Sequence, residues 1–272
     1  MYRFFVSGEA IKEGTVTISG PDAHHIRDVL RMKAGDEIFV CTGDEWEYTC
    51  SIETLTSEEV TARITDAAKS GKELPGRIVL YQCLPKGDKM ETVIQKAVEL
   101  GAAEIVPVLS SRCVSRPDRK KAEGKLKRWN QIAEAAAKQA KRMVVPQVAG
   151  ILDFKEAVSR ACNSDVCLLP YEKCENMAET RQILNAIQSG SSISVLIGPE
   201  GGFSEEEANA AEKAGFSAIS LGRRILRTET AGMAVLAMLV FLLDRSKRFN
   251  DGSLSGSCGH HLGVPGSGRT DE

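Results

Sequence analysis

Short apolar runs of β-branched and aromatic residues dominate the first 70 positions of the chain. Glycine, aspartate and serine separate these runs, which is typical of short strands. The expected strands are residues 4–6, 15–18, 37–41, 47–52 and 60–64. One helix interrupts them, beginning at Asp22 as the N-cap, running through Leu30 and ending near Gly35. Many short strands with one helix predict a small β-barrel.

Beyond residue 76 the pattern changes to strands that alternate with amphipathic helices. Residues 66–76, rich in lysine, glycine and glutamate, are expected to form the linker before them. The expected strands are 78–81, 105–109, 166–169, 193–197 and 219–221, and the expected helices are 90–100, 122–141, 153–161, 178–188, 204–214 and one that begins at 228. This alternation predicts an α/β fold with a mostly parallel sheet flanked by helices.

These patterns divide the chain into a β domain of residues 1–70, an α/β domain of residues 71–245, and a tail. A length of 272 residues accommodates two ordinary domains. The tail, residues 246–272, is rich in glycine and serine, so we expect it to be disordered. The longest apolar run, residues 231–243, is shorter than the roughly 20 residues of a membrane span. It is expected to be a core or interface helix.

The overall composition is that of a soluble globular protein, with 42% hydrophobic and 26% charged residues. Eight scattered cysteines include no C-x-x-C pair, and His24 and His25 have no third ligand nearby, so no metal site is expected. We recognise no signal peptide, which makes the cytoplasm the expected compartment. The net charge of −2 gives no overall sign of a nucleic-acid partner.

Residues 116–142 carry the positive charge that the chain as a whole lacks. The segment contains ten lysines and arginines and only three acidic residues, which gives it a net charge of +7. Phosphate contacts dominate the affinity of proteins for nucleic acids, so this segment predicts an RNA-binding surface. A solvated helix face is the alternative interpretation. If RNA binds, we expect Lys125 and Arg128 to contact its phosphates.

Two glycine-bearing loops follow strands near the end of the α/β segment, at residues 198–204 and 222–231. Such loops at the carboxyl ends of strands are where open α/β sheets bind ligands, because glycine lets a backbone approach a ligand closely. Ordinary turn glycines are the alternative. That alternative explains neither Glu200 between glycines nor Arg227 beside Glu229 at a helix start, where a cation opposes the helix dipole.

Neither loop has the glycine pattern of a P-loop or of a dinucleotide-binding fold. Residues 196–204 and 221–231 instead resemble the two signature loops of the SPOUT-superfamily (trefoil-knot) RNA methyltransferases. The resemblance continues through residues 84–90, 94–101 and 128–129, and it covers residues 2–243 in order. It is closest to the family that methylates N3 of a uridine in the 16S RNA of the small ribosomal subunit, described for that family as uridine 1498.

The resemblance implies a PUA-like RNA-binding barrel before a methyltransferase domain with a C-terminal knot, and a homodimer. It also implies S-adenosylmethionine as the methyl donor and 16S ribosomal RNA as the partner. The residues themselves indicate neither a metal nor a membrane as a partner. The donor is expected to contact Leu196, Ile197, Gly198, Pro199, Gly201, Leu221, Gly222, Ile225, Leu226 and Arg227. RNA contacts are expected at Arg27, Arg31, Lys125, Arg128, Gln139 and Arg142.

Methylation of uracil N3 requires removal of the N3 proton and stabilisation of the resulting anion. A carboxylate can serve as the base, and a cation can stabilise the charge on a uracil oxygen. We expect Glu229 to be the base and Arg227 to be the cation, with Glu200 as the alternative base. Helix capping or turn structure is the competing role of the two acids.

Two other functions remain open at this point. The chain could be an RNA-binding protein without catalytic activity, or a methyltransferase that acts on transfer RNA. The intact glycines of both loops, together with Arg227 and Glu229, argue against the first alternative. The second belongs to the same superfamily, so substrate assays are needed to separate it from ribosomal RNA methylation.

Overall fold

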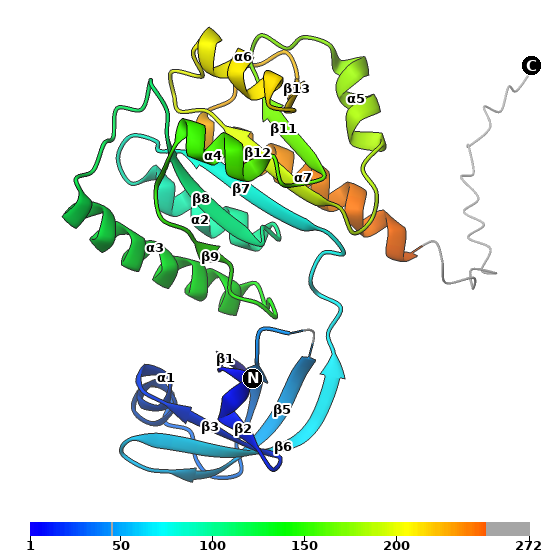
Figure 1. Ribbon diagram of the computed structural model, residues 1–272. Helices are drawn as coiled ribbons and strands as arrows, with labels where there is room; N and C mark the ends of the chain where they lie inside the picture. The colour runs from blue at the N-terminus through cyan, green and yellow to red at the C-terminus, as the bar shows by residue number, and fades with distance from the viewer. Residues whose placement is uncertain (45, 249–272) are drawn as a thin grey trace, which may run out of the picture.

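The computed structural model describes residues 1–44 and 46–248, with side chains described as far as Asp244. Figure 1 shows a small β unit at the N-terminus and a larger α/β unit above it, joined by one extended connection. Each unit has its own hydrophobic core. The tail expected at residues 246–272 falls almost entirely outside the described residues.

The N-terminal unit is a six-stranded β sheet, as expected for a β domain, although the strands at residues 46–55 and 59–69 are longer than predicted. Its strands lie in the order β1-β4-β5-β6-β3-β2, with β1 parallel to β4 and the other pairs antiparallel. The strands are β1 (Tyr2–Phe5), β2 (Ile11–Lys12), β3 (Thr15–Ser19), β4 (Glu37–Cys41), β5 (Trp46–Leu55) and β6 (Glu59–Lys69). Alternate residues such as Val16, Ile18 and Ile38 are buried. Because β6 extends to Lys69, the linker begins later than expected.

The helix of this unit begins two residues earlier than predicted. Helix α1 (Pro21–His24) has Gly20 as its N-cap and continues as a π-helical turn, η2 (His25–Val29). Proline suits the first helical position because its missing N–H would have no partner there. Asp22 is therefore not the cap. Its carboxylate instead accepts a hydrogen bond from Lys138 Nζ of the other unit at 2.9 Å.

The second unit contains an all-parallel sheet, which confirms the α/β prediction. Its order is β10-β8-β7-β12-β11-β13, and β9 pairs with β8. The strands are β7 (Arg77–Cys83), β8 (Glu104–Leu109), β9 (Gln147–Val148), β10 (Leu152–Asp153), β11 (Val166–Pro170), β12 (Ser192–Ile197) and β13 (Ser217–Ile219). The central strands β7 and β12 are buried along nearly their whole length, and apolar residues fill most of their positions.

Helices cover both faces of this sheet. They are α2 (Lys89–Glu99), α3 (Arg119–Gln139), α4 (Phe154–Ala161), α5 (Met177–Asn185), α6 (Glu205–Lys213) and α7 (Thr228–Arg248). Figure 1 shows α4 in front of the sheet and α2 with α7 behind it, and α3 packs on the outside of α2. Among the described residues, no helix is long and apolar enough to cross a membrane.

The predicted start of α6 is confirmed in detail. Ser204 Oγ accepts a hydrogen bond from the Glu207 N–H at 3.1 Å, and the Glu207 carboxylate accepts one from the Ser204 N–H at 3.0 Å. This reciprocal capping fixes the direction in which the loop after β12 enters the helix. The loop that contains Gly198 and Glu200 is therefore held between a buried strand and a capped helix.

Candidate active site

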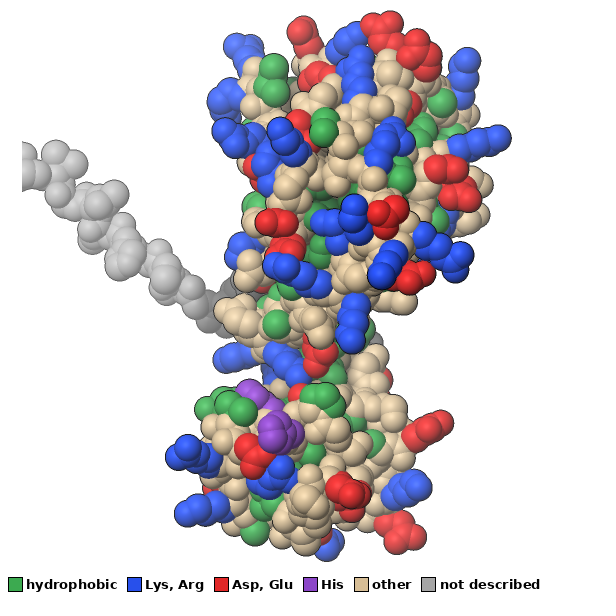
Figure 2. All heavy atoms as spheres, turned by 90° about the vertical axis from the view of Figure 1, so that its left-hand side faces the viewer, with side chains coloured by type: hydrophobic (Ala, Val, Ile, Leu, Met, Phe, Trp, Pro, Cys, Tyr) green, Lys and Arg blue, Asp and Glu red, His purple; other side chains and the backbone are tan. Residues whose placement is uncertain are grey.

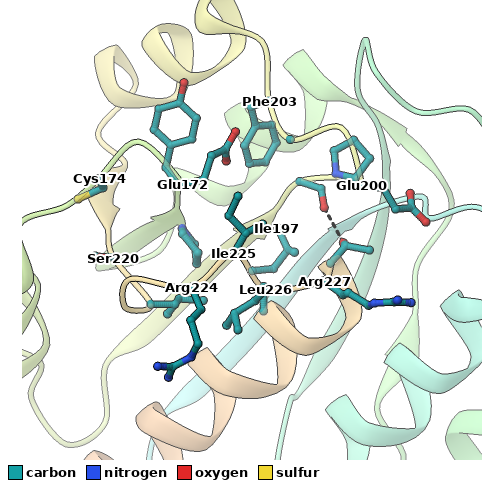
Figure 3. Close-up of a pocket in the computed structure, with 18 of the residues that line it drawn as sticks. Glu172, Cys174, Ile197, Glu200, Phe203, Ser220, Arg224, Ile225, Leu226 and Arg227 are labelled. Carbon is teal, nitrogen blue, oxygen red and sulfur yellow. Dashed lines mark hydrogen bonds between the residues drawn. The ribbon is translucent and has the colours of Figure 1, made fainter.

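A pocket of about 530 Å³ opens where β11, β12 and β13 end. Three loops line it, residues 170–174, 197–203 and 220–228, together with Lys89 of α2. Figure 3 shows side chains from these three loops around one cavity, with Glu172 and Phe203 at one side and Arg227 and Glu200 at another. The two glycine-bearing loops thus meet in space, as the sequence predicted, and the loop after β11 completes the wall.

Nine of the ten expected donor contacts line this pocket. They are Ile197, Gly198, Pro199, Gly201, Leu221, Gly222, Ile225, Leu226 and Arg227. Leu196 does not line it, because this side chain is fully buried within β12. Alternation along the strand places Ile197 next to the pocket and leaves Leu196 in the core.

The wall of the pocket at Gly202 leaves no room for a side chain. Gly202 has φ +65°, and a Cβ there would lie 2.5 Å from Glu172 Oε1. Only glycine adopts that backbone conformation without strain and also leaves space for the carboxylate. Gly202 and Glu172 were not predicted as donor contacts from the sequence, although the repeated glycine was a visible signal.

Thr228 connects α7 by hydrogen bonds to β7 and to the loop after β12. The sequence did not predict this role. Its hydroxyl donates to the Gly198 carbonyl at 2.6 Å and accepts from Gln82 Nε2 at 2.8 Å. Gln82 is fully buried in β7, and Thr228 begins α7. The dashed line in Figure 3 marks the hydrogen bond to Gly198. A glutamine within an apolar strand was the sequence signal that could have indicated such a buried network.

We expect Thr228→Val to lower the free energy of unfolding by about 1–3 kcal/mol, because the Gly198 carbonyl and the Gln82 amide lose a buried partner. Valine keeps the shape of threonine, so the change isolates the hydroxyl. Chemical denaturation measures the effect. Thr65→Val is the matched control, because the exposed Thr65 hydroxyl donates to the Thr49 carbonyl near the surface. Equal stability of both variants and the parent would contradict the network's role.

Glu200 is held at the mouth of the pocket by donors from two other segments. Its Oε1 accepts a hydrogen bond from the Lys86 N–H at 3.0 Å and one from Lys89 Nζ at 3.1 Å. Partial burial alone would raise the pKa of Glu200. Hydrogen bonds from backbone N–H groups, its own and that of Lys86, together with the Lys89 ammonium, outweigh burial and lower this pKa. A carboxylate so stabilised is a weak base.

Glu229 lies in the first turn of α7, next to the pocket but not among its lining residues. Its side chain is 17% exposed, and its Oε2 is 3.6 Å from Lys89 Nζ. Among the described residues, this buried oxygen has no hydrogen-bond partner. A buried acceptor without a partner is costly, so such atoms in a native site are candidates for contact with a ligand.

The cations expected to bind RNA differ in how available they are. Arg142 is 7% exposed, and its Nη1 donates to the Ala102 carbonyl at 2.6 Å while its Nε donates to Glu73 at 3.2 Å. The Arg142 guanidinium thus connects the end of α3 to Glu73 of the linker. Because it is buried and already hydrogen-bonded, the structure argues against the expected RNA contact. Arg27 donates from Nη1 to the Thr56 and Ser57 carbonyls, both at 2.7 Å, and holds that turn.

The remaining four expected RNA contacts are on the surface. Arg31 is exposed at the end of the first helix, with φ +53°. Lys125 is half-buried with its Nζ 5.8 Å from the centre of the Trp129 ring, and the exposed Arg128 pairs with Glu91 at 2.7 Å. Gln139 is exposed beside a groove between α2 and α3. Figure 2 shows many lysine and arginine side chains on this side of the molecule, interspersed with acidic ones.

No metal site was expected, and within residues 1–44 and 46–248 no group of three or more His, Cys, Asp or Glu side chains could hold a metal ion. The seven cysteines in these ranges are free thiols. Most of them are buried, where a thiol packs as a small hydrophobic group.

Comparison with known proteins agrees with this architecture. A family model described as an RNA methyltransferase domain matches residues 72–240, and one described as an RNA methyltransferase PUA domain matches residues 18–65. Ribosomal RNA small subunit methyltransferase E of Bacillus subtilis is 35% identical over 247 residues, which cover 89% of this chain and 96% of the relative. The Synechocystis protein of the same name is 32% identical, covering 89% of this chain and 78% of its own length.

A solved structure gives the same result in three dimensions. The ribosomal RNA small subunit methyltransferase E of Neisseria gonorrhoeae, bound to S-adenosyl methionine, superposes with a TM-score of 0.74 and 32% identity. The match covers 89% of this chain and 98% of that one. In this chain the region that matches the RNA methyltransferase domain follows the region that matches the PUA domain. The chain therefore belongs to the ribosomal RNA small subunit methyltransferase E family.

Proposed function

We propose that this protein transfers a methyl group from S-adenosylmethionine to N3 of a uridine in the 16S RNA of the small ribosomal subunit. The observation that carries the proposal is the pocket of the two glycine-bearing loops, with Glu200, Lys89 and Glu229 clustered at one end. This arrangement combines a cavity for a donor with acid–base groups for a substrate. The family and the names of the relatives support the reaction and the RNA.

The pocket fits a nucleoside-containing donor. Its volume of about 530 Å³ lies within the roughly 300–1,000 Å³ of small-molecule sites. Ile197, Leu221 and Leu226 offer apolar surface for a base, and the glycines leave backbone groups accessible. When bound, S-adenosylmethionine supplies an electrophilic methyl group. The donor-bound state of the Neisseria gonorrhoeae relative supports the same ligand here.

The charged residues at the end of the pocket have separate tasks in this proposal. Glu229 removes the proton from N3, for which an ionised carboxylate with a free lone pair is required. Arg227 is exposed at the same end and compensates the negative charge that spreads onto a uracil oxygen. Glu200 is already hydrogen-bonded through Oε1, so we assign it to holding Lys86 and Lys89 in place.

The reaction is tested by incubating the protein with S-adenosylmethionine and, separately, small ribosomal subunits, naked 16S RNA and transfer RNA. Nucleoside digestion with mass spectrometry identifies the product. We expect 3-methyluridine in 16S RNA, at the uridine that the family modifies. If the methylated product appeared only in transfer RNA, transfer RNA would replace 16S RNA as the proposed substrate. Donor and RNA binding without any product would instead support an RNA-binding protein that lacks catalysis.

We also propose that α3 and the β unit bind the RNA. Replacing Lys125 and Arg128 together by alanine should weaken binding and flatten its salt dependence by about one slope unit for each phosphate that is no longer neutralised. Titrations at several salt concentrations measure the slope. Lys155→Ala with Lys213→Ala removes equal charge from exposed positions on α4 and α6, and should leave the slope unchanged. An unchanged slope in the first variant would make α3 a solvated face.

A homodimer through α7 and a trefoil knot in the C-terminal region are further parts of the proposal that rest on the family. Ala237 is exposed on α7, whereas the neighbouring Met238 and Leu242 are half-buried. We expect the parent to be a dimer and Ala237→Glu to be a monomer, because a buried charge at the contact is unfavourable. Sedimentation velocity measures both. Ala210→Glu on the exposed face of α6 is the control, and a monomeric parent would contradict the proposal.

A further inference from the structure

Lys89 occupies a position that helix stability does not explain. It is the first residue of α2, immediately after the N-cap Asp88. A cation at a helix N-terminus faces the positive end of the helix dipole, which is unfavourable. The side chain is 34% exposed and lines the pocket. Its place is therefore better explained by the groups that it contacts than by the helix.

The Lys89 ammonium lies between two carboxylates from different parts of the chain. Its Nζ is 3.1 Å from Glu200 Oε1, on the loop after β12, and 3.6 Å from Glu229 Oε2, on α7. These three elements come together only in the folded protein. One ammonium thus compensates two acids at the end of the pocket that holds the proposed base.

The two acids depend on Lys89 to different degrees. Glu200 also accepts a hydrogen bond from the Lys86 N–H, so it keeps a donor if the ammonium is removed. Glu229 Oε2 is buried and has no hydrogen-bond partner within the described parts of the chain. Burial without a nearby cation favours the neutral form of a carboxyl group, and a neutral carboxyl group cannot accept the N3 proton.

The other charged groups near Glu229 do not replace Lys89. Glu200, across the same ammonium, carries a like charge and opposes ionisation of Glu229. Arg227 precedes α7 by one residue and is exposed, and among the described residues it forms no ion pair with either acid. In Figure 3 the Arg227 side chain extends away from the centre of the pocket. Lys89 is thus the cation closest to the proposed base.

We propose that Lys89 is a positioning residue for methyl transfer, whose ammonium keeps the Glu229 carboxylate ionised and fixed beside the pocket. This inference rests on the proposed function, in which Glu229 accepts the N3 proton. Lys89 acts through Glu229 and need not touch the RNA. Its absence is consequently expected to change the pH at which the enzyme becomes active, in addition to the rate.

The first test compares single-turnover methyl transfer at saturating donor and small subunits across pH for the parent, Lys89→Met and Lys89→Arg. Without the ammonium that lies 3.6 Å from its Oε2, the buried Glu229 carboxyl group loses the nearby charge that favours its ionised form. Lys89→Met should therefore be slowed most strongly at acidic pH, with the deficit shrinking as pH rises. Lys89→Arg should retain most of the rate. Lys96→Met, which removes a paired lysine from the same helix, should match the parent.

The second test does not depend on activity. The carboxyl carbon of Glu229 is followed by ¹³C NMR as pH is changed, and Glu229→Gln identifies its signal. The titration midpoint should move to higher pH in Lys89→Met and remain near the parent value in Lys89→Arg and Lys96→Met. An unchanged midpoint, or a rate deficit in Lys89→Met that is the same at every pH, would overturn the inference. A parent protein without methylation would refute the proposed function, whereas the NMR result would still show whether Lys89 controls Glu229.

Discussion

Replacing Glu229 by glutamine is expected to slow single-turnover methyl transfer by about 10²–10⁴-fold, the usual contribution of a general base. Glutamine keeps the size of the side chain and can accept a hydrogen bond, but it cannot take the N3 proton. Donor affinity should be unchanged, because Glu229 does not line the pocket of the two loops. Rapid-quench measurement at saturating donor and RNA, with calorimetry of donor binding, separates the chemical step from binding.

Glu200→Gln is the matched control for this variant. Burial would raise the pKa of Glu200, but hydrogen bonds from its own N–H, the Lys86 N–H and Lys89 outweigh burial and lower this pKa, which makes Glu200 a weaker base than an ordinary carboxylate. We therefore expect a smaller loss of rate from Glu200→Gln. A parent-like rate for Glu229→Gln together with a large loss for Glu200→Gln would move the role of base to Glu200. Parent-like rates for both would place the base elsewhere.

The sequence predicted the elements of this fold well because their signals are local. The capping box of Ser204 and Glu207 depends on residues three apart, and it begins the helix that was predicted at residues 204–214. A short β-branched run that is bounded by turn residues, such as the one that forms β12, is typical of a buried strand. The first helix was misplaced because Asp22 is a good N-cap by type, whereas the preceding Gly20-Pro21 pair in fact begins the helix.

Side-chain partners far apart in sequence could not be predicted in the same way. Lys89 and Glu200 form a hydrogen bond although they are 111 positions apart in the sequence. Gln82 and Thr228 do so at a separation of 146 positions. Periodicity shows which face of a strand or helix is buried but not which element covers it. Arg142 shows the converse error, because a basic segment suggested an RNA contact for a side chain whose guanidinium is enclosed by Glu73 and backbone carbonyls. Net charge along a segment does not report which of its cations are already paired.

The glycines of the first loop could be recognised from the sequence, whereas their closest neighbours could not. A Cβ on Gly198 would lie 3.2 Å from the Phe203 ring, and a Cβ on Gly202 would lie 2.5 Å from Glu172 Oε1. Glu172 belongs to the loop after β11, so the width of the pocket depends on the contact between that loop and Gly202. The loop sequence alone indicated a ligand site, and the fold determines how much room the ligand has.

Gly198→Val is expected to weaken donor binding by about 5- to 150-fold. The added side chain must displace Phe203 or enter the pocket, and overpacking of this kind costs about 1–3 kcal/mol. Calorimetry with S-adenosylmethionine measures the affinity. Thermal unfolding without donor shows whether the fold itself is retained.

Gly124→Val is the matched control for that substitution. Gly124 lies in α3, and a Cβ there would meet no atom within 4 Å. Donor affinity should therefore equal that of the parent. In Gly198→Val, by contrast, the rate of methyl transfer at saturating donor should fall less than the affinity does, because Glu229 and Lys89 lie outside the first loop. Unchanged donor affinity in a folded Gly198→Val protein would show that the donor does not lie against this loop, and the proposed cofactor site would have to move.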